Sequence, residues 1–161
     1  MAEFRFIEQP PQGAHPVTAE DLDRVESKFH FSFPRVLRDY YLQYNGCDVI
    51  FSQFTRDGDI WDVLEMRAIG KGRWNLEELI RRDRTYDFIP DHLIPLAVSS
   101  VDGFYYWDTR DEKVYLTYYE EEGDFKLMCT GLDTFFDILN HACEMQDENN
   151  LYDITKYSEE R

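Results

Sequence analysis

The sequence is short of basic residues. Its 161 residues include 17 Lys or Arg against 33 Asp or Glu, which gives a formal charge of −16 with neutral histidines. Binding to a phosphate backbone or to an anionic membrane needs clustered Lys and Arg, and this composition does not supply them. We therefore expect no direct contact with nucleic acid or membrane. A basic protein is the natural complement of such a chain.

Cysteines and long apolar runs are also scarce. Cys47, Cys129 and Cys143 are odd in number and form no Cys-x-x-Cys pair, so neither a disulfide framework nor a zinc site is indicated. No stretch approaches the roughly 18 to 20 apolar residues that cross a bilayer, and the N-terminus has no export-signal pattern. The sequence therefore predicts a protein of the reducing cytoplasm, with its cysteines as small buried side chains.

Motifs for catalysis and cofactor binding are missing as well. Gly70-Lys71-Gly72-Arg73 lacks the earlier glycine and the following hydroxyl of a phosphate-binding loop, and Ser99-Ser100 lies in no nucleophile elbow. Asp57, Asp59 and Asp62 begin like a calcium loop but lack its glycine and its bidentate glutamate, which favours a solvated turn. We expect no catalytic residue, no metal and no cofactor. A carboxylate-dependent or metal-dependent hydrolase is the weaker alternative.

The apolar content, in contrast, is sufficient for one core. With 43% hydrophobic and 16% aromatic residues and no repeat or linker, residues 1–161 are expected to form a single domain. Residues 1–16 are interpreted as an irregular lead-in. The last 15 residues are interpreted as a polar tail in which four apolar side chains are available to dock, namely Leu151, Tyr152, Ile154 and Tyr157.

Hydrophobic spacing predicts two helices near the N-terminus. Thr18 and Asp21 resemble a capping box, and the apolar residues after them favour a helix over 19–29. A second helix over 34–45 is predicted to end at Asn45-Gly46, a left-handed helix stop.

Short β-rich runs follow. Segments 49–54 and 60–66 are predicted to form a hairpin, and Asn75 is predicted to cap a short helix. Four antiparallel strands are then expected over 93–98, 104–109, 113–119 and 125–129. Thr130 and Asp133 are interpreted as the capping box of a closing amphipathic helix. The fold class is therefore α+β, with a mainly antiparallel mixed sheet flanked by the N-terminal helix pair and the C-terminal helix.

The negative charge is concentrated late in the chain. Residues 102–161 hold 16 acids and 5 bases, a net −11, and this part is rich in tyrosine and includes Trp107. Strand alternation places Phe104, Tyr106 and Asp108 on one side, and Tyr105 and Trp107 on the other. One side is expected in the core, and the other is a candidate contact face. A solvated hairpin edge with its aromatics in the core explains the same composition, and the sequence leaves both interpretations open.

Several motifs, taken in order, resemble the SUKH superfamily. They are Val17 to Leu22, Phe33-Pro34, Asn45-Gly46, Ile94-Pro95-Leu96-Ala97, Asp102-Gly103 leading to Tyr106-Trp107-Asp108, and Phe135 to Leu139. The resemblance spans about residues 17–142, with Phe33 in place of the usual Leu and Cys47 in place of a second glycine.

This resemblance implies a function. Many bacterial SUKH members are non-enzymatic immunity proteins that bind and neutralise a cognate polymorphic toxin, often a nuclease or deaminase, and some fungal relatives regulate cell-wall synthesis. We therefore expect a toxin-binding immunity protein, with a regulatory protein-interaction domain as the alternative. The expected partner-binding residues are acids and one aromatic of the late strands: Asp102, Tyr106, Asp108, Glu120, Glu121, Glu122 and Asp124.

Overall fold

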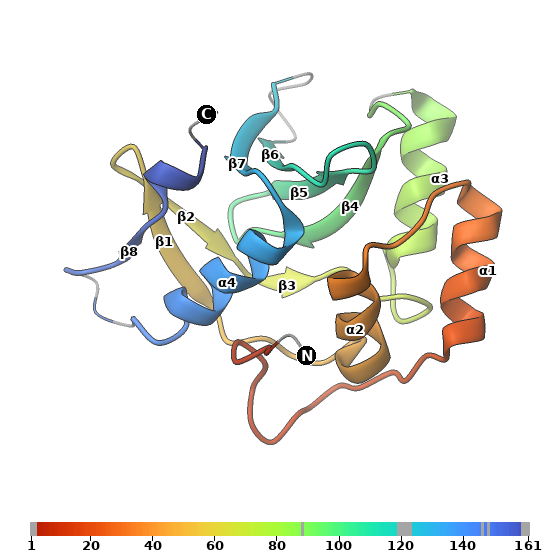
Figure 1. Ribbon diagram of the computed structural model, residues 1–161, viewed down its shortest axis with the longest axis horizontal. Helices are drawn as coiled ribbons and strands as arrows, with labels where there is room; N and C mark the ends of the chain where they lie inside the picture. Colours follow the sequence, from red (N-terminus) through yellow and green to blue (C-terminus); the bar gives the residue numbers. More distant parts are fainter. Residues whose placement is uncertain (1–2, 88, 119–123, 146, 148, 159–161) are drawn as a thin grey trace.

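The computed structural model describes residues 3–87, 89–118, 124–145, 147 and 149–158, and is shown in Figure 1. Within these residues it contains four α-helices, two sheets and a short 3-10 helix over Thr155–Ser158. The predicted α+β class is confirmed. No helix in the described part of the chain is long and apolar enough to cross a membrane.

The N-terminal helix pair forms as predicted. Helix α1 (Ala19–Phe29) begins with the capping box of Thr18 and Asp21, and α2 (Arg35–Tyr44) begins after Pro34. Gly46 follows α2 with φ of 82°, the left-handed conformation that a glycine adopts without steric cost. Arg38 joins the two helices through ion pairs to Asp23 at 3.1 Å and Glu26 at 2.9 Å. Both helices also contribute buried apolar side chains to the same core.

The predicted hairpin forms with different bounds. Strands β1 (Ser52–Arg56) and β2 (Asp59–Val63) pair in antiparallel fashion around a two-residue turn at Asp57-Gly58. The second predicted strand, 60–66, is wrong as a single element, because the chain leaves the first sheet after Val63 and β3 (Glu65–Met66) joins the second. Strand β8 (Tyr152–Asp153) pairs parallel to β1, so the C-terminal tail docks as expected.

The four-strand meander is confirmed. Strands β4 (Leu93–Val98), β5 (Gly103–Asp108), β6 (Val114–Tyr118) and β7 (Lys126–Cys129) form the second sheet in the order β3-β4-β5-β6-β7. The β4–β5 turn requires glycine at 103, because an added Cβ would lie 2.6 Å from the hydroxyl oxygen of Ser99. That hydroxyl also accepts a hydrogen bond from the Gly103 amide at 2.9 Å.

Helix α4 (Leu132–Ala142) crosses in front of the sheets in Figure 1. The predicted capping box at Thr130 is wrong: Gly131 occupies the N-cap position and makes no side-chain hydrogen bond there. The helix is held mainly by burial, since Phe135 lies 6.2 Å from Tyr105 and Phe136 lies 5.8 Å from Phe6, centroid to centroid.

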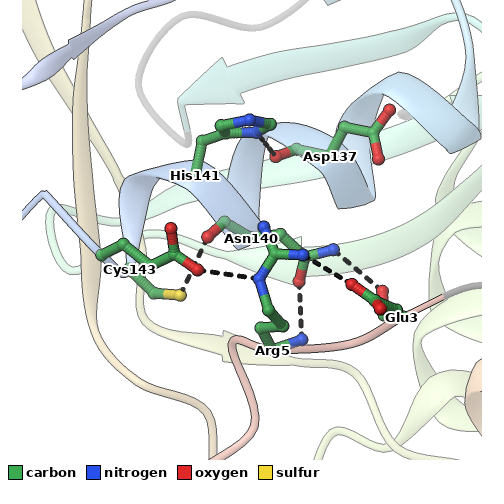
Figure 2. Close-up of polar contacts among 7 residues, drawn as sticks. Glu3, Arg5, Asp137, Asn140, His141 and Cys143 are labelled. Carbon is green, nitrogen blue, oxygen red and sulfur yellow. Dashed lines mark hydrogen bonds and ion pairs between the residues drawn. The ribbon is translucent and has the colours of Figure 1, made fainter.

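The N-terminal lead-in belongs to the core, which its composition did not indicate. Phe4, Phe6 and Ile7 are at most 6% exposed. Figure 2 shows how this segment is fixed to α4: the Arg5 amide donates to the Asn140 side-chain oxygen at 2.7 Å, and the Asn140 side-chain amide donates to the Glu3 carbonyl at 2.8 Å. Two segments more than 130 residues apart in sequence thereby close one core.

Candidate partner-binding surfaces

The predicted acidic residues divide into exposed and buried groups. Asp102 is exposed in the β4–β5 turn with φ of 61°, and Asp124 is exposed before β7. Because Gly103 pairs with Tyr118, Asp102 lies at the end of the sheet where the β6–β7 connection begins. Glu120, Glu121 and Glu122 lie outside the described residues. The exposed predicted acids therefore belong to one end of the second sheet.

Asp108 is buried, with 1% of its surface exposed. Burial by itself would raise the pKa of its carboxyl, but hydrogen bonds from Arg110 outweigh this and hold the pKa below its usual value. Arg110 donates from Nη2 at 2.9 Å and from its backbone amide at 2.8 Å, and the ring of His92 lies 3.8 Å away. Asp108 therefore orders the turn after β5, and its side chain is not accessible to a partner that binds this conformation.

Tyr106 is also buried, which corrects the expectation that one side of β5 faces a partner. Its hydroxyl lies 3.3 Å from the Asp83 carboxylate on α3 (Leu76–Tyr86), and Asp83 pairs with Arg82 at 3.1 Å. Burial raises the pKa of Asp83, and the contacts with Arg82 and Tyr106 counteract this only in part. The opposite side of β5 is equally covered, since Tyr105 and Trp107 are at most 1% exposed.

A second acidic surface lies on the outer side of α4. Asp133, Asp137 and Glu144 are exposed, and in Figure 2 the Asp137 carboxylate points away from the other side chains drawn. Within the described residues, Arg5 is the base that neutralises part of this surface, through an ion pair to Glu144 at 2.8 Å. The His141 ring stacks on Tyr152 at 5.2 Å, which places a flat aromatic surface beside the carboxylates.

A surface of opposite character surrounds Trp74, and we refer to Arg73, Trp74, Arg82 and Leu64 as the Trp74 surface. Trp74 is 44% exposed, whereas Trp61 and Trp107 are 5% and 1% exposed. The guanidinium groups of Arg73 and Arg82 each lie 5.6 Å from its ring centroid, a cation–π distance. Trp, Tyr and Arg dominate the residues that contribute most to protein interfaces.

Trp74 has an unusual backbone conformation. Its φ is 60°, which costs a non-glycine residue on the order of 1–3 kcal/mol, and its amide donates to the Glu78 carboxylate at 2.9 Å. Glycine would fit this position more easily, and the indole does not compensate by filling the core. The loop thus holds an exposed aromatic ring at some expense to stability.

A groove of about 470 Å³ lies beside the Trp74 surface. Its walls are the residues around β3 (64–68), the segment 46–49 and the loop 71–75. Lys71 fixes two of these walls, because its ammonium group donates to the carbonyls of Gly13 and Gly46. Arg67 forms part of the wall and pairs with Glu65 at 3.5 Å.

The local charge reverses here. Residues 67–84 hold six bases and three acids, a net +3 within a chain of −16. Two of the three acids are used by the loop itself, since Glu77 accepts from the Gly70 amide at 3.1 Å and Glu78 from the Trp74 amide. Arg73, in contrast, pairs with no carboxylate among the described residues.

These features belong to an α+β fold that carries exposed carboxylates at one sheet end and on α4, and an exposed tryptophan with two arginines. Comparison with known families agrees: residues 16–138 match the SMI1 / KNR4 family (SUKH-1). The chain belongs to this family and is a SUKH-domain protein. Members of this class are often immunity proteins. No curated protein matches the chain.

Sequence reasoning missed both the α4 surface and the Trp74 surface. From the sequence, Asp133 is interpreted only as part of a capping box and Asp137 only as part of the family motif Phe135 to Leu139, although their spacing of four already places them on one helix face. The excess of bases over 67–84 was also visible in the sequence, but the arrangement of two arginines on one indole depends on the left-handed loop at Trp74.

Proposed function

We propose that this protein is a non-enzymatic immunity protein that binds and neutralises a cognate protein toxin. The observation that carries the proposal is the field of the C-terminal part, a net −11 over residues 102–161, in a chain of the SUKH-1 family. A toxin that acts on nucleic acid needs a basic site for phosphates, and an acidic inhibitor is attracted to such a site and covers it.

The exposed acids of the sheet end are the proposed docking residues. Asp102 and Asp124 are exposed, and Glu120, Glu121 and Glu122 are retained from the sequence as part of the same connection. Tyr106 and Asp108 have a different role in the proposal: they support the strands from inside. The carboxylates on α4 provide the competing location for the same interaction, so the two acidic surfaces are tested against each other.

The test begins with co-purification of the protein with products of neighbouring genes. Surface plasmon resonance then compares the wild type with Glu120→Lys/Glu122→Lys, with Asp133→Lys/Asp137→Lys, and with Glu20→Lys on α1 as the matched reversal elsewhere. We expect the loop pair to reduce the association rate by about tenfold or more at low salt, because charge complementarity acts mainly on encounter. The same variant should abolish protection in a growth assay with the toxin.

The other outcomes each have a meaning. Loss confined to the α4 pair moves the docking surface to α4 and leaves the function intact. Wild-type rates in all variants, with no steep salt dependence, contradict the electrostatic mechanism. A partner from cell-wall synthesis in place of a toxin indicates the regulatory class of SUKH protein.

A further inference from the structure

We propose that the Trp74 surface and its adjoining groove bind an extended acidic segment of a protein partner. This inference does not depend on the toxin proposal, since it concerns a surface of opposite charge and a different ligand chemistry. An apolar side chain of the segment would pack on the Trp74 ring, and its carboxylates would pair with Arg73 and Arg82.

The first support is the backbone at the groove. Strand β3 is at the edge of the second sheet and pairs with β4 on one side, while its residues form one wall of the groove. No described strand pairs with its other side. An edge strand beside a groove is the setting in which an extended peptide adds to a sheet, with backbone hydrogen bonds for affinity and side-chain pockets for specificity.

The second support is an apolar contact area at the groove. Trp74 and Leu64 are 44% and 46% exposed and both line it. Exposed side chains of this size on a rim contribute little to folding, but they become anchors when a partner removes them from water. The exposure of Trp74 shows that its indole lies outside the core, on a loop with a left-handed backbone at this residue.

The third support is charge complementarity. Arg73 and Arg82 both lie over the Trp74 ring. Arg82 also forms an ion pair with the buried Asp83, whose carboxylate accepts a hydrogen bond from the Tyr106 hydroxyl. Planar guanidinium groups fixed in this way suit carboxylates, which they bind through paired hydrogen bonds. The Glu78 carboxylate accepts a hydrogen bond from the Trp74 amide at 2.9 Å, so this acid is already engaged by the loop.

Aromatic and arginine side chains together also bind single-stranded nucleic acid. The groove disfavours a continuous phosphate chain, because Glu8, Asp48 and Glu65 lie among its lining residues and would repel negative charges spread along it. The carboxylates of a bound segment therefore have to lie at the end formed by Arg73, with Arg82 beside it. The net charge of −16 acts against a polyanion at longer range. A short acidic segment carries fewer charges and places them only beside the arginines.

The experiment uses the full chain and two labelled octapeptides, Gly-Ser-Asp-Phe-Asp-Leu-Ser-Gly and the same peptide with Lys at both acids. Binding is followed by fluorescence polarisation and by the indole N–H signals in two-dimensional NMR. Trp61 and Trp107 are buried and serve as internal controls for Trp74. We expect the acidic peptide to shift the Trp74 signal alone, with Kd in the range of about 10 µM to 1 mM.

Three variants separate binding from folding. Arg73→Glu should weaken binding of the acidic peptide by roughly tenfold. Trp74→Gly should remove detectable binding while the thermal midpoint stays within about 4 °C of the wild type. Arg35→Glu, an exposed arginine on α2, is the matched control and should bind as the wild type does. Trp74→Gly also fits the left-handed backbone, so its loss of binding does not reflect unfolding.

The proposal fails if both peptides shift the Trp74 signal equally, or if Arg73→Glu and Arg35→Glu behave alike. It also fails if an eight-nucleotide oligothymidylate binds more tightly than the acidic peptide, because the surface then recognises nucleic acid. A chain that does not bind the toxin but does bind the acidic peptide refutes the proposed function and leaves this inference standing.

Discussion

The two kinds of surface differ in how charge and aromatic side chains are combined. In the C-terminal part the described tyrosines and Trp107 are buried or half-buried, while most of the described carboxylates are exposed and Asp108 is the buried exception. Around Trp74, in contrast, the aromatic ring is exposed and two arginines lie on it. Exposed carboxylates around a buried sheet provide long-range attraction with few anchors. An exposed indole under two guanidinium groups provides an anchor with a short-range charge preference.

The largest expected effect comes from a substitution in the core that supports both kinds of surface. Leu37 is fully buried on α2, so Leu37→Ala should lower the free energy of unfolding by about 2–5 kcal/mol. Leu42 on the same helix is 41% exposed, and Leu42→Ala should change it by about 0.5 kcal/mol or less. Urea unfolding of both variants provides the measurement. A stable Leu37→Ala protein would show that α2 does not pack as described.

The helices and strands were largely predictable because their signals are local. The capping box of α1, the glycine after α2 and the turn residues between the meander strands each act within a few residues of themselves. The predictions failed where distant contacts decide. Phe4 and Phe6 are core residues because they meet Phe136 and Tyr40, which a composition with several prolines and a glycine nearby does not reveal.

The candidate surfaces were less predictable for a related reason. Alternation correctly separated Tyr106 and Asp108 from Tyr105 and Trp107. It could not show that α3 contacts Tyr106, or that Arg110 and His92 contact Asp108. Sheets with helices or loops on both faces bury both sets of side chains. The sequence located the acidic charge, and only the tertiary contacts around β5 determined that Asp108 is buried while Asp102 remains exposed.

An effect of intermediate size distinguishes two buried carboxylates. Asp108 has a pKa below its usual 3.8, so its contribution to stability is present at neutral pH and is lost as the pH falls through the lowered value. Asp83 has a raised pKa, so its contribution to the free energy of unfolding is more favourable at low pH than at high pH. This advantage is lost as the pH rises through the raised value.

The measurement is urea unfolding of the wild type, Asp108→Asn and Asp83→Asn between about pH 3 and pH 7. The stability advantage of the wild type over Asp108→Asn should shrink toward the acidic end. The stability of the wild type relative to Asp83→Asn should instead increase toward the acidic end. Parallel curves for the two comparisons would contradict the opposite environments assigned to these carboxylates.

The smallest expected effect isolates the role of Trp74 in stability. Trp74→Gly removes an exposed ring and replaces a strained left-handed residue by the one that adopts this conformation most easily. Glycine also gives the unfolded chain more freedom, which offsets part of the gain. We therefore expect the free energy of unfolding to rise or fall by no more than about 1 kcal/mol.

The corresponding change at Trp61, which is buried and stacked with Arg56, should instead cost about 3–5 kcal/mol. If Trp74→Gly destabilises the protein as strongly as Trp61→Gly, the indole at 74 is a structural residue, and the contrast between the two kinds of surface no longer holds.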